Sequence, residues 1–154
     1  MYKRQKKHLF TFGGEHKRFT AGTERVVVNF RGVRILLEVC YDLRFPVWSR
    51  NLGDYDMILY VASWPTPRVD AWSALLRARA IENQCYVAGV NRMGVDPACE
   101  YSGGSAIIDP YGKTIAECPW SRESAVSADI DMEALQAFRK KFPVLDDADP
   151  FTLI

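Results

Sequence analysis

The sequence predicts an α/β protein with a mixed β-sheet. Strand-like and helical segments alternate along the first part of the chain, and strand-like segments then follow one another. The first pattern is typical of parallel strands joined by helices, and the second is typical of antiparallel strands. Of the 154 residues, 48% are hydrophobic, so the chain is long enough to bury the core of one domain.

The first predicted element is a β-hairpin. VVVNF and VRILLEV, residues 26–30 and 33–39, are runs of β-branched and aliphatic side chains, which strands favour. The turn-prone pair Arg31-Gly32 separates them. Two such runs joined by so short a turn are expected to pair with each other.

A short helix, a strand and a longer helix are predicted next. Residues 45–52 carry Pro46 in the first turn and Gly53 just past the end, the asymmetry that helices prefer. DMILYVAS, residues 56–63, reads as a buried strand. Residues 70–84 form the longer helix, which should pack on the sheet. Its apolar residues recur at helical spacing and include Ala71, Leu75, Ala78 and Ile81.

Strands dominate the last part of the chain. CYVAGVNR, residues 85–92, predicts one strand, and residues 103–118 predict two strands around a Pro-Tyr-Gly turn. SAVSADI, residues 124–130, predicts a further strand. Asp131 is placed to cap a closing helix that runs through Arg139.

The charge balance excludes several classes of partner. Twenty basic and nineteen acidic residues nearly cancel, which argues against a protein that binds nucleic acid or an anionic membrane. The longest apolar run, residues 57–64, has only the length of a strand and is too short to span a bilayer. No apolar stretch or cleavage site follows the basic start, MYKRQKKHLF, so a secretory signal is not predicted. We therefore expect a cytoplasmic protein whose partner is a small molecule.

The four cysteines do not form a metal or disulfide pattern. Cys40, Cys85, Cys99 and Cys118 are widely spaced without a CxxC pair, and the chain has only two histidines. No phosphate-cradling glycine-rich loop is present either. The sequence therefore implies no cofactor and no metal, and a cysteine must be judged by its local context.

Cys40 has such a context. It stands in ILLEVCYDLRFP, where a hydrophobic strand runs into the cysteine and then into a helix that starts at proline. A strand-to-helix elbow presents a side chain at the carboxyl end of the strand, with backbone N–H groups free to hold an oxyanion. Cys40 is thus a candidate nucleophile, and a core cysteine that ends a strand is the alternative.

A nucleophilic cysteine attacks as a thiolate and needs a group that lowers its pKa or takes its proton. His8 and His16 both lie in a polar N-terminal stretch, so a papain-like cysteine–histidine pair is one alternative. A lysine of the same N-terminal stretch is the other alternative for the group that acts on the cysteine.

Seven consecutive motifs stand out along the chain, namely QKKHLF, GGEHKRFTAG, EVCYDLRFP, YVASWP, LLRARAIENQCYVAGVNRMG, EYSGGSAIIDPYGK and FRKKFPVLDDADPFTL. Their order and spacing resemble the nitrilase superfamily of carbon–nitrogen hydrolases, and in particular its omega-amidase-like branch. The resemblance covers nearly every residue. It implies a Glu–Lys–Cys triad in which the cysteine attacks an amide carbon, ammonia leaves and water hydrolyses the thioester.

The resemblance places the catalytic residues at two positions. Cys40 matches the nucleophile, and Lys6 of QKKHLF matches the catalytic lysine, with Lys7 as the alternative. An ammonium group suits this role because it stabilises both the thiolate and the oxyanion.

Five residues are expected to support the reaction or bind the substrate. Glu15 matches a second glutamate that positions the lysine or the substrate, and a solvated loop acid is its alternative. The backbone N–H of Tyr41 is expected in the oxyanion hole. Asp42 and Arg44 are expected to pair across the elbow. Trp64 matches an aromatic residue that borders the substrate, with an ordinary core tryptophan as the alternative.

The resemblance also predicts what is missing. The family fold is a four-layer αββα sandwich, and its catalytic glutamate lies in a front half that precedes the lysine motif, whereas Glu15, Glu24 and Glu38 follow it. Residues 1–154 are thus expected to form a single, N-terminally truncated domain with the front half missing. Bared apolar faces then predict a homo-oligomer. Two functions stay open: an amidase acting on a small carboxylate-bearing amide, or an inactive relative with a binding or assembly role.

Overall fold

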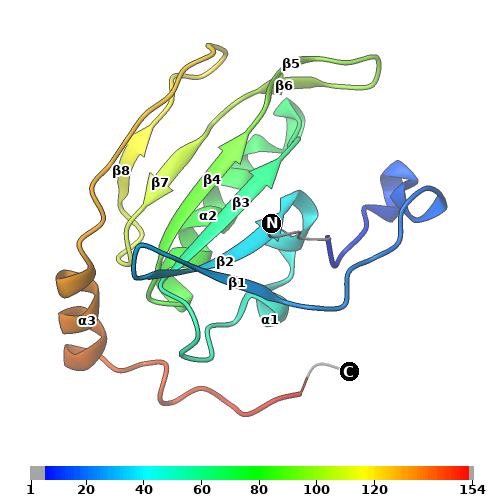
Figure 1. Cartoon of the computed structure of the whole chain (residues 1–154). Coiled ribbons are helices and arrows are strands. Elements are labelled where there is room, and N and C mark those ends of the chain that lie inside the picture. The colour runs from blue at the N-terminus through cyan, green and yellow to red at the C-terminus, as the bar shows by residue number, and fades with distance from the viewer. Residues whose placement is uncertain (1–5, 153–154) are drawn as a thin grey trace.

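The computed structural model of the protein describes residues 6–152 and contains a six-stranded mixed sheet with the longest helix behind it (Figure 1). The strand order is β1-β2-β3-β4-β7-β8. The three strands β2, β3 and β4 are parallel, and the remaining neighbours are antiparallel. The predicted α/β fold with a mixed sheet is therefore confirmed.

The element bounds are as follows. The strands of the large sheet are β1 (Val26–Phe30), β2 (Val33–Val39), β3 (Met57–Ala62), β4 (Tyr86–Asn91), β7 (Ala106–Ile108) and β8 (Thr114–Glu117). A separate two-stranded sheet consists of β5 (Met93–Val95) and β6 (Glu100–Ser102). The α-helices are α1 (Pro46–Ser49), α2 (Val69–Glu82) and α3 (Met132–Lys141). Short 3-10 helices are η1 (Thr11–Gly13), η2 (Glu15–Lys17), η3 (Cys40–Arg44) and η4 (Thr66–Arg68).

The predicted hairpin is present and its turn explains its register. β1 and β2 pair antiparallel, with Phe30 opposite Val33. Arg31 and Gly32 both have positive φ, 51° and 84°, which is the backbone of the two-residue turn that matches strand twist. The side chain of Asn29 accepts a hydrogen bond from the Gly32 N–H at 3.1 Å and stabilises the turn.

Helix α2 covers one face of the sheet. Leu36, Ile58 and Val87 are buried on this side, where Trp72 and Leu76 of the helix join them in one core. Gly89 allows the helix to lie close to β4, because a Cβ atom at that position would stand 2.4 Å from the Leu76 Cδ1 atom. The predicted helix at residues 70–84 is confirmed, although it begins one residue earlier and ends at Glu82.

The opposite face of the sheet is apolar and only partly covered. Val61 and Val90, which are register partners on β3 and β4, are 48% and 50% exposed. Other side chains alternate onto this same face and are partly exposed, namely Ile35, Met57, Leu59 and Ile107. We call these six residues the open face.

The predicted helix at residues 45–52 is wrong in its length. It is a single turn that ends at Ser49, because the chain beyond it is bound to the end of α2. The Asn51 N–H donates to Oδ1 of Asn83 at 2.9 Å, and the Asn51 amide donates to the Asn83 carbonyl at 3.0 Å. These tertiary bonds satisfy groups that a longer helix would have paired internally.

The predicted strand at residues 124–130 is also wrong. The structure has no strand at these residues, and the side chain of Val126 is 38% exposed. Small and polar side chains such as those of SAVSADI bury little area if they pair along β8, so the alternation alone does not create a strand. The hairpin of β5 and β6 was not predicted, because three-residue strands are too short to show a period.

Helix α3 begins as predicted. Asp131 caps it by accepting a hydrogen bond from the Ala134 N–H at 2.8 Å, and the helix continues two residues past Arg139 to Lys141. Within residues 6–152 no helix is long and apolar enough to cross a membrane.

Asp56 ties α3 to the sheet. Its carboxylate, which is only 2% exposed, lies 2.7 Å from Nη2 of Arg34 and 2.9 Å from Nη1 of Arg139. Burial alone would raise the pKa of Asp56, but the hydrogen bonds and charge of Arg34, with Arg139, hold it below its ordinary value. The two guanidinium groups therefore stabilise the ionised carboxylate in the folded chain.

We expect Asp56→Ala to lower the free energy of unfolding by roughly 3 kcal/mol, because it leaves two arginines around a vacated buried site. Urea denaturation measures this change, and Asp147→Ala at an exposed position is the control. Because the folded pKa is lowered, the Asp56 contribution is full above the unfolded value of about 4 and disappears as pH falls through the folded value. The free energy of unfolding of the wild type should therefore rise more between pH 3 and 6 than that of Asp56→Ala. An equal or smaller rise in the wild type would contradict this assignment.

Candidate active site

Cys40 stands at the carboxyl end of β2, where the chain enters η3. Its φ of 48° lies in the left-handed region, which non-glycine residues occupy at a cost of about 1–3 kcal/mol and mainly at functional sites. The sulfur lies 3.9 Å from the carbonyl oxygen of Ser63, which follows the parallel neighbour β3. The predicted elbow is present, with the difference that a 3-10 turn separates the strand from α1.

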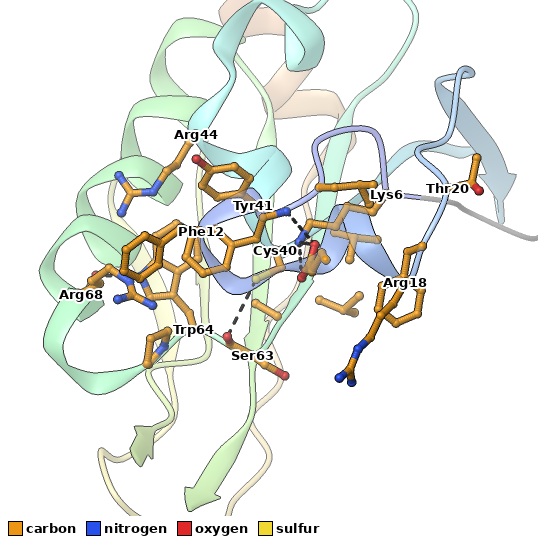
Figure 2. A pocket seen from close by; sticks show the side chains of 18 residues that line it. Lys6, Phe12, Arg18, Thr20, Cys40, Tyr41, Arg44, Ser63, Trp64 and Arg68 are labelled. Atoms are coloured by element: carbon orange, nitrogen blue, oxygen red, sulfur yellow. Dashed lines mark hydrogen bonds and ion pairs between the residues drawn. The ribbon is translucent and has the colours of Figure 1, made fainter. Parts of the chain in front are cut away.

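An open cavity of about 1170 Å³ surrounds the thiol. Figure 2 shows the Cys40 side chain between Lys6 on one side and Trp64 on the other. Aromatic side chains form much of the wall, namely Phe10, Phe12, Phe19, Tyr41 and Trp64. Four cationic side chains also line it, Lys6, Arg18, Arg44 and Arg68, whereas Glu15 is the only acidic residue of the lining within residues 6–152. The cavity is therefore suited to a small anionic molecule.

Lys6 is held beside the cavity by Glu15. The Lys6 Nζ atom lies 2.7 Å from Oε2 and 3.0 Å from Oε1 of Glu15, and the lysine side chain is 12% exposed. The Phe10 N–H donates to the same Oε2 at 2.7 Å. Burial raises the pKa of Glu15, but the hydrogen bonds from Lys6 and Phe10 outweigh it and leave the pKa below the ordinary value. Glu15 is thus an ionised partner of Lys6 rather than a solvated loop acid.

The surroundings of Cys40 act on its thiol in opposite directions. Burial raises the pKa of the thiol, and the ammonium of Lys6 offsets only part of that rise. Backbone hydrogen bonding at Ser63 and Tyr41 also lowers the pKa of the thiol, whereas the charge of Glu15 raises it. The net result is a raised pKa, so attack on a substrate requires a group that accepts the thiol proton.

Trp64 serves the core and the cavity at once. The indole is 3% exposed, and its ring centroid lies 5.5 Å from that of Trp72. The Trp64 Nε1–H donates to the Arg68 carbonyl at 2.7 Å, while the guanidinium of Arg44 lies 4.9 Å from the Trp64 ring centroid. Trp64 therefore packs in the core and also lines the cavity, and its contact with a substrate stays a prediction.

The expected pairing of Asp42 with Arg44 is wrong. Asp42 accepts hydrogen bonds from the His8 backbone N–H at 2.9 Å and lies 3.0 Å from the His8 Nδ1 atom, whereas Arg44 stacks on Trp64. Residues two apart in a helical turn point in different directions, so the two side chains of η3 face different neighbours.

The alternatives for the proton-handling group are placed elsewhere. The ring of His8 is stacked on Phe45 and directed at Asp42, and His16 is exposed in η2. The Lys7 Nζ atom lies 5.0 Å from the ring centroid of Trp48, whereas Lys6 lines the cavity. Among these candidates in the described part of the chain, Lys6 is thus the one whose charge lowers the pKa of the Cys40 thiol.

Arg18 and Arg68 line the cavity and were not predicted. Arg68 lies in η4, with its guanidinium 5.6 Å from the ring centroid of Phe10, and Arg18 follows η2. Nothing in their local sequence distinguishes them from solvated arginines, because only the tertiary fold brings their segments together. Among residues 6–152 no group of three His, Cys, Asp or Glu side chains is arranged to hold a metal ion.

A cysteine and a lysine–glutamate pair in an open cavity at the carboxyl ends of parallel strands form the small-molecule site typical of open α/β proteins. The sequence model of the family described as carbon-nitrogen hydrolase matches residues 1–140. The chain therefore belongs to the carbon–nitrogen hydrolase family of the nitrilase superfamily.

Two curated relatives show where in the family the similarity is high. The chain is 55% identical over 149 residues to the omega-amidase YafV of Escherichia coli (strain K12), covering 96% of this chain and 58% of that protein. It is 42% identical over 145 residues to the 2-oxoglutaramate amidase of Bacillus subtilis (strain 168), covering 93% of this chain and 56% of the relative. The chain thus spans less than two thirds of the length of each relative.

The fold is also that of a solved relative. XC1258 from Xanthomonas campestris, a CN-hydrolase superfamily protein, superposes with a TM-score of 0.93 at 48% identity. The match covers 97% of this chain and 59% of XC1258. The crystal structure of XC1258 contains an arsenic adduct in its active site.

Proposed function

We propose that this chain carries the nucleophile of an amide hydrolase, with Cys40 attacking the carbonyl carbon of a small amide beside the Lys6 ammonium. The observation that carries the proposal is the ion pair of Lys6 and Glu15 beside the thiol in one open cavity. Family membership supports the reaction class. Arsenic binds thiols readily, so the adduct in XC1258 also agrees with a reactive cysteine at this site.

The chemistry follows from the groups around the sulfur. The Cys40 sulfur bonds to the amide carbon, and the resulting oxyanion is stabilised by the backbone N–H of Tyr41 and by Lys6. The C–N bond then breaks, and the nitrogen leaves as ammonia after it takes up the proton that the thiol has lost. Water hydrolyses the thioester, which releases the carboxylic acid and restores the thiol.

The proton transfers need a general base. Glu15 is poorly suited to this role, because its pKa is lowered and both its carboxylate oxygens contact Lys6. The resemblance assigns this base to a glutamate in the family's front half. We propose accordingly that Glu15 positions Lys6 and that the proton acceptor is supplied by that half.

We propose that the substrate is the omega-amide of a dicarboxylic acid. Arg44 and Trp64 line the cavity that contains the thiol, and Arg18 and Arg68 add positive charge to the same cavity. A free carboxylate on the substrate would complement this charge. The relatives named omega-amidase and 2-oxoglutaramate amidase support the same class.

Ammonia release from 2-oxoglutaramate tests the function, with a neutral amide of equal length for comparison. We expect the carboxylate-bearing amide to be preferred and the Cys40→Ala variant to be inactive. Equal rates for both amides would contradict the substrate class while leaving the nucleophile in place.

A second candidate function is binding or assembly without turnover. One observation favours it. Glu15 is the only described carboxylate that lines the cavity, and it is bound in an ion pair by Lys6, so it is not available as a general base. A chain of this kind would bind a dicarboxylic acid in the cavity and release no ammonia from its amide. Calorimetry with the acid, beside the ammonia assay, separates the two functions.

We further propose that the open face corresponds to the sheet face that lies between the two sheets of the four-layer sandwich. In a homo-oligomer this face would become buried against another sheet. Its six apolar residues support this, because exposed apolar patches mark interaction surfaces. The cytoplasm remains the proposed compartment, since all four cysteines are unpaired.

The expected result is an assembly larger than a monomer in gel filtration with light scattering. Val90→Lys should shift the assembly toward monomer, because it places a charge on the open face. Val95→Lys, at a 74% exposed position on β5, is the matched control and should leave the mass unchanged. A folded wild-type monomer at micromolar concentration would contradict the proposal.

A further inference from the structure

His8 forms a polar link between the N-terminal stretch and the elbow that carries Cys40. Its backbone N–H donates to Oδ1 of Asp42 at 2.9 Å, and its Nδ1 atom lies 3.0 Å from the same oxygen. The other carboxylate oxygen of Asp42 accepts the Val39 N–H at 3.2 Å. The Asp42 side chain is fully buried, so this carboxylate bridges His8 and the residue that precedes Cys40.

The His8 ring is also held by packing. It stacks on Phe45 with a centroid distance of 3.7 Å and an interplanar angle of 8°, and its edge meets Trp48 at 6.1 Å. The imidazole therefore has one orientation, with Nδ1 directed at the carboxylate. The Nδ1 atom and the carboxylate oxygen are therefore held at hydrogen-bond distance, and a carboxylate oxygen serves as the acceptor of such a bond.

Each partner of this bond lies two residues from a group of the candidate active site. Lys6 precedes His8 by two positions, and Cys40 precedes Asp42 by two positions. Two residues of chain span at most about 7 Å, so fixing His8 on Asp42 restricts where the lysine can lie relative to the thiol. Within its own stretch Lys6 is held by Glu15 and by the Gly22 N–H, which donates to the Lys6 carbonyl at 2.8 Å.

We propose that His8 is a positioning residue: through Asp42 it holds Lys6 against Cys40 and so sets the reactivity of the thiol. This inference rests on the roles of Cys40 and Lys6 in the proposed function. The imidazole itself takes no proton from the substrate or the thiol. It fixes the place from which the ammonium of Lys6 acts.

Alkylation of Cys40 by iodoacetamide across a range of pH tests the inference without any amide turnover. The rate reports the thiolate fraction, and mass spectrometry of the Cys40 peptide separates it from the other cysteines. His8→Phe keeps a ring against Phe45 and removes the Nδ1 bond. His8→Asn keeps a donor near the Nδ1 position and removes the ring. His16→Phe, at an exposed position of the same stretch, is the matched control.

We expect His8→Phe to slow alkylation about 3- to 10-fold near neutral pH and to move the profile to higher pH, because one pKa unit changes the thiolate fraction tenfold. His8→Asn and His16→Phe should stay within about twofold of the wild type. In a Lys6→Met background the His8→Phe effect should vanish, because the positioned ammonium is already absent.

Three results would overturn the inference. They are a folded His8→Phe variant with an unchanged rate, an equal effect in the Lys6→Met background, and a His8→Asn variant slower than His8→Phe, which would indicate packing alone. Circular dichroism checks folding, and His8→Leu replaces His8→Phe if the latter does not fold. A shifted alkylation profile without amide hydrolysis would support His8 and reject only the proposed function.

Discussion

Replacing Cys40 by alanine is expected to abolish ammonia release from an omega-amide in any form of the protein that shows it. The alanine side chain cannot form the thioester, so the two-step route through a covalent intermediate is lost. Losses of roughly a millionfold follow removal of a covalent nucleophile in well-studied hydrolases, and the rate should therefore fall to that of the buffer. The measurement is a coupled assay for ammonia, with intact-protein mass spectrometry to detect the acylated chain.

Cys99→Ala is the matched control for this variant. Cys99 is also partly exposed, but it lies beside β6 in the small hairpin and does not line the cavity. Its variant should hydrolyse the amide at the wild-type rate and should still acylate. Turnover that survives in Cys40→Ala, or an acyl group found on another residue, would eliminate the nucleophile assignment.

Lys6→Met is expected to lower kcat/KM by about 100- to 10,000-fold, the range for removing a group that stabilises charge or transfers protons at the reacting centre. The substitution keeps a long flexible side chain and removes only the charge. Because the ammonium of Lys6 lowers the pKa of Cys40, its loss should raise that pKa further. The alkaline shift of the thiol alkylation profile measures this second effect.

Lys7→Met provides the comparison for Lys6. The two lysines are adjacent in sequence, yet Lys7 lies over the ring of Trp48 and does not line the cavity. We expect its variant to retain activity within about twofold and to leave the alkylation profile of Cys40 unchanged. Equal losses in both variants would mean that general positive charge, rather than one positioned ammonium, supports the reaction.

The elements that could be predicted from sequence are those specified by local interactions. The hairpin turn at Arg31-Gly32 needs only two residues with positive φ, and the cap at Asp131 needs only the Ala134 N–H. The end of α1 could not be predicted, because Asn51 is bound by Asn83, which is far away in the chain. Strand pairing is likewise a tertiary event, so the alternation at residues 124–130 was not a sufficient signal.

The candidate site divides in the same way. Cys40 could be found from its elbow, because a strand, a cysteine and a proline follow one another in the sequence. Lys6 and Glu15 were found only by resemblance, since a polar stretch with short 3-10 turns has no period that would show their contact. Arg18 and Arg68 were missed, because tertiary folding alone brings them to the cavity.

The left-handed backbone at Cys40 implies a conflict between folding and chemistry at a single position. A φ of 48° is the conformation that glycine adopts most readily, whereas the proposed reaction requires a thiol there. Selection for stability alone would favour loss of this side chain, so its retention would have to be maintained by selection for activity. The neighbouring hydrogen bond that the Val39 N–H donates to Asp42 then compensates locally, because it holds the turn in a backbone conformation that Cys40 itself disfavours.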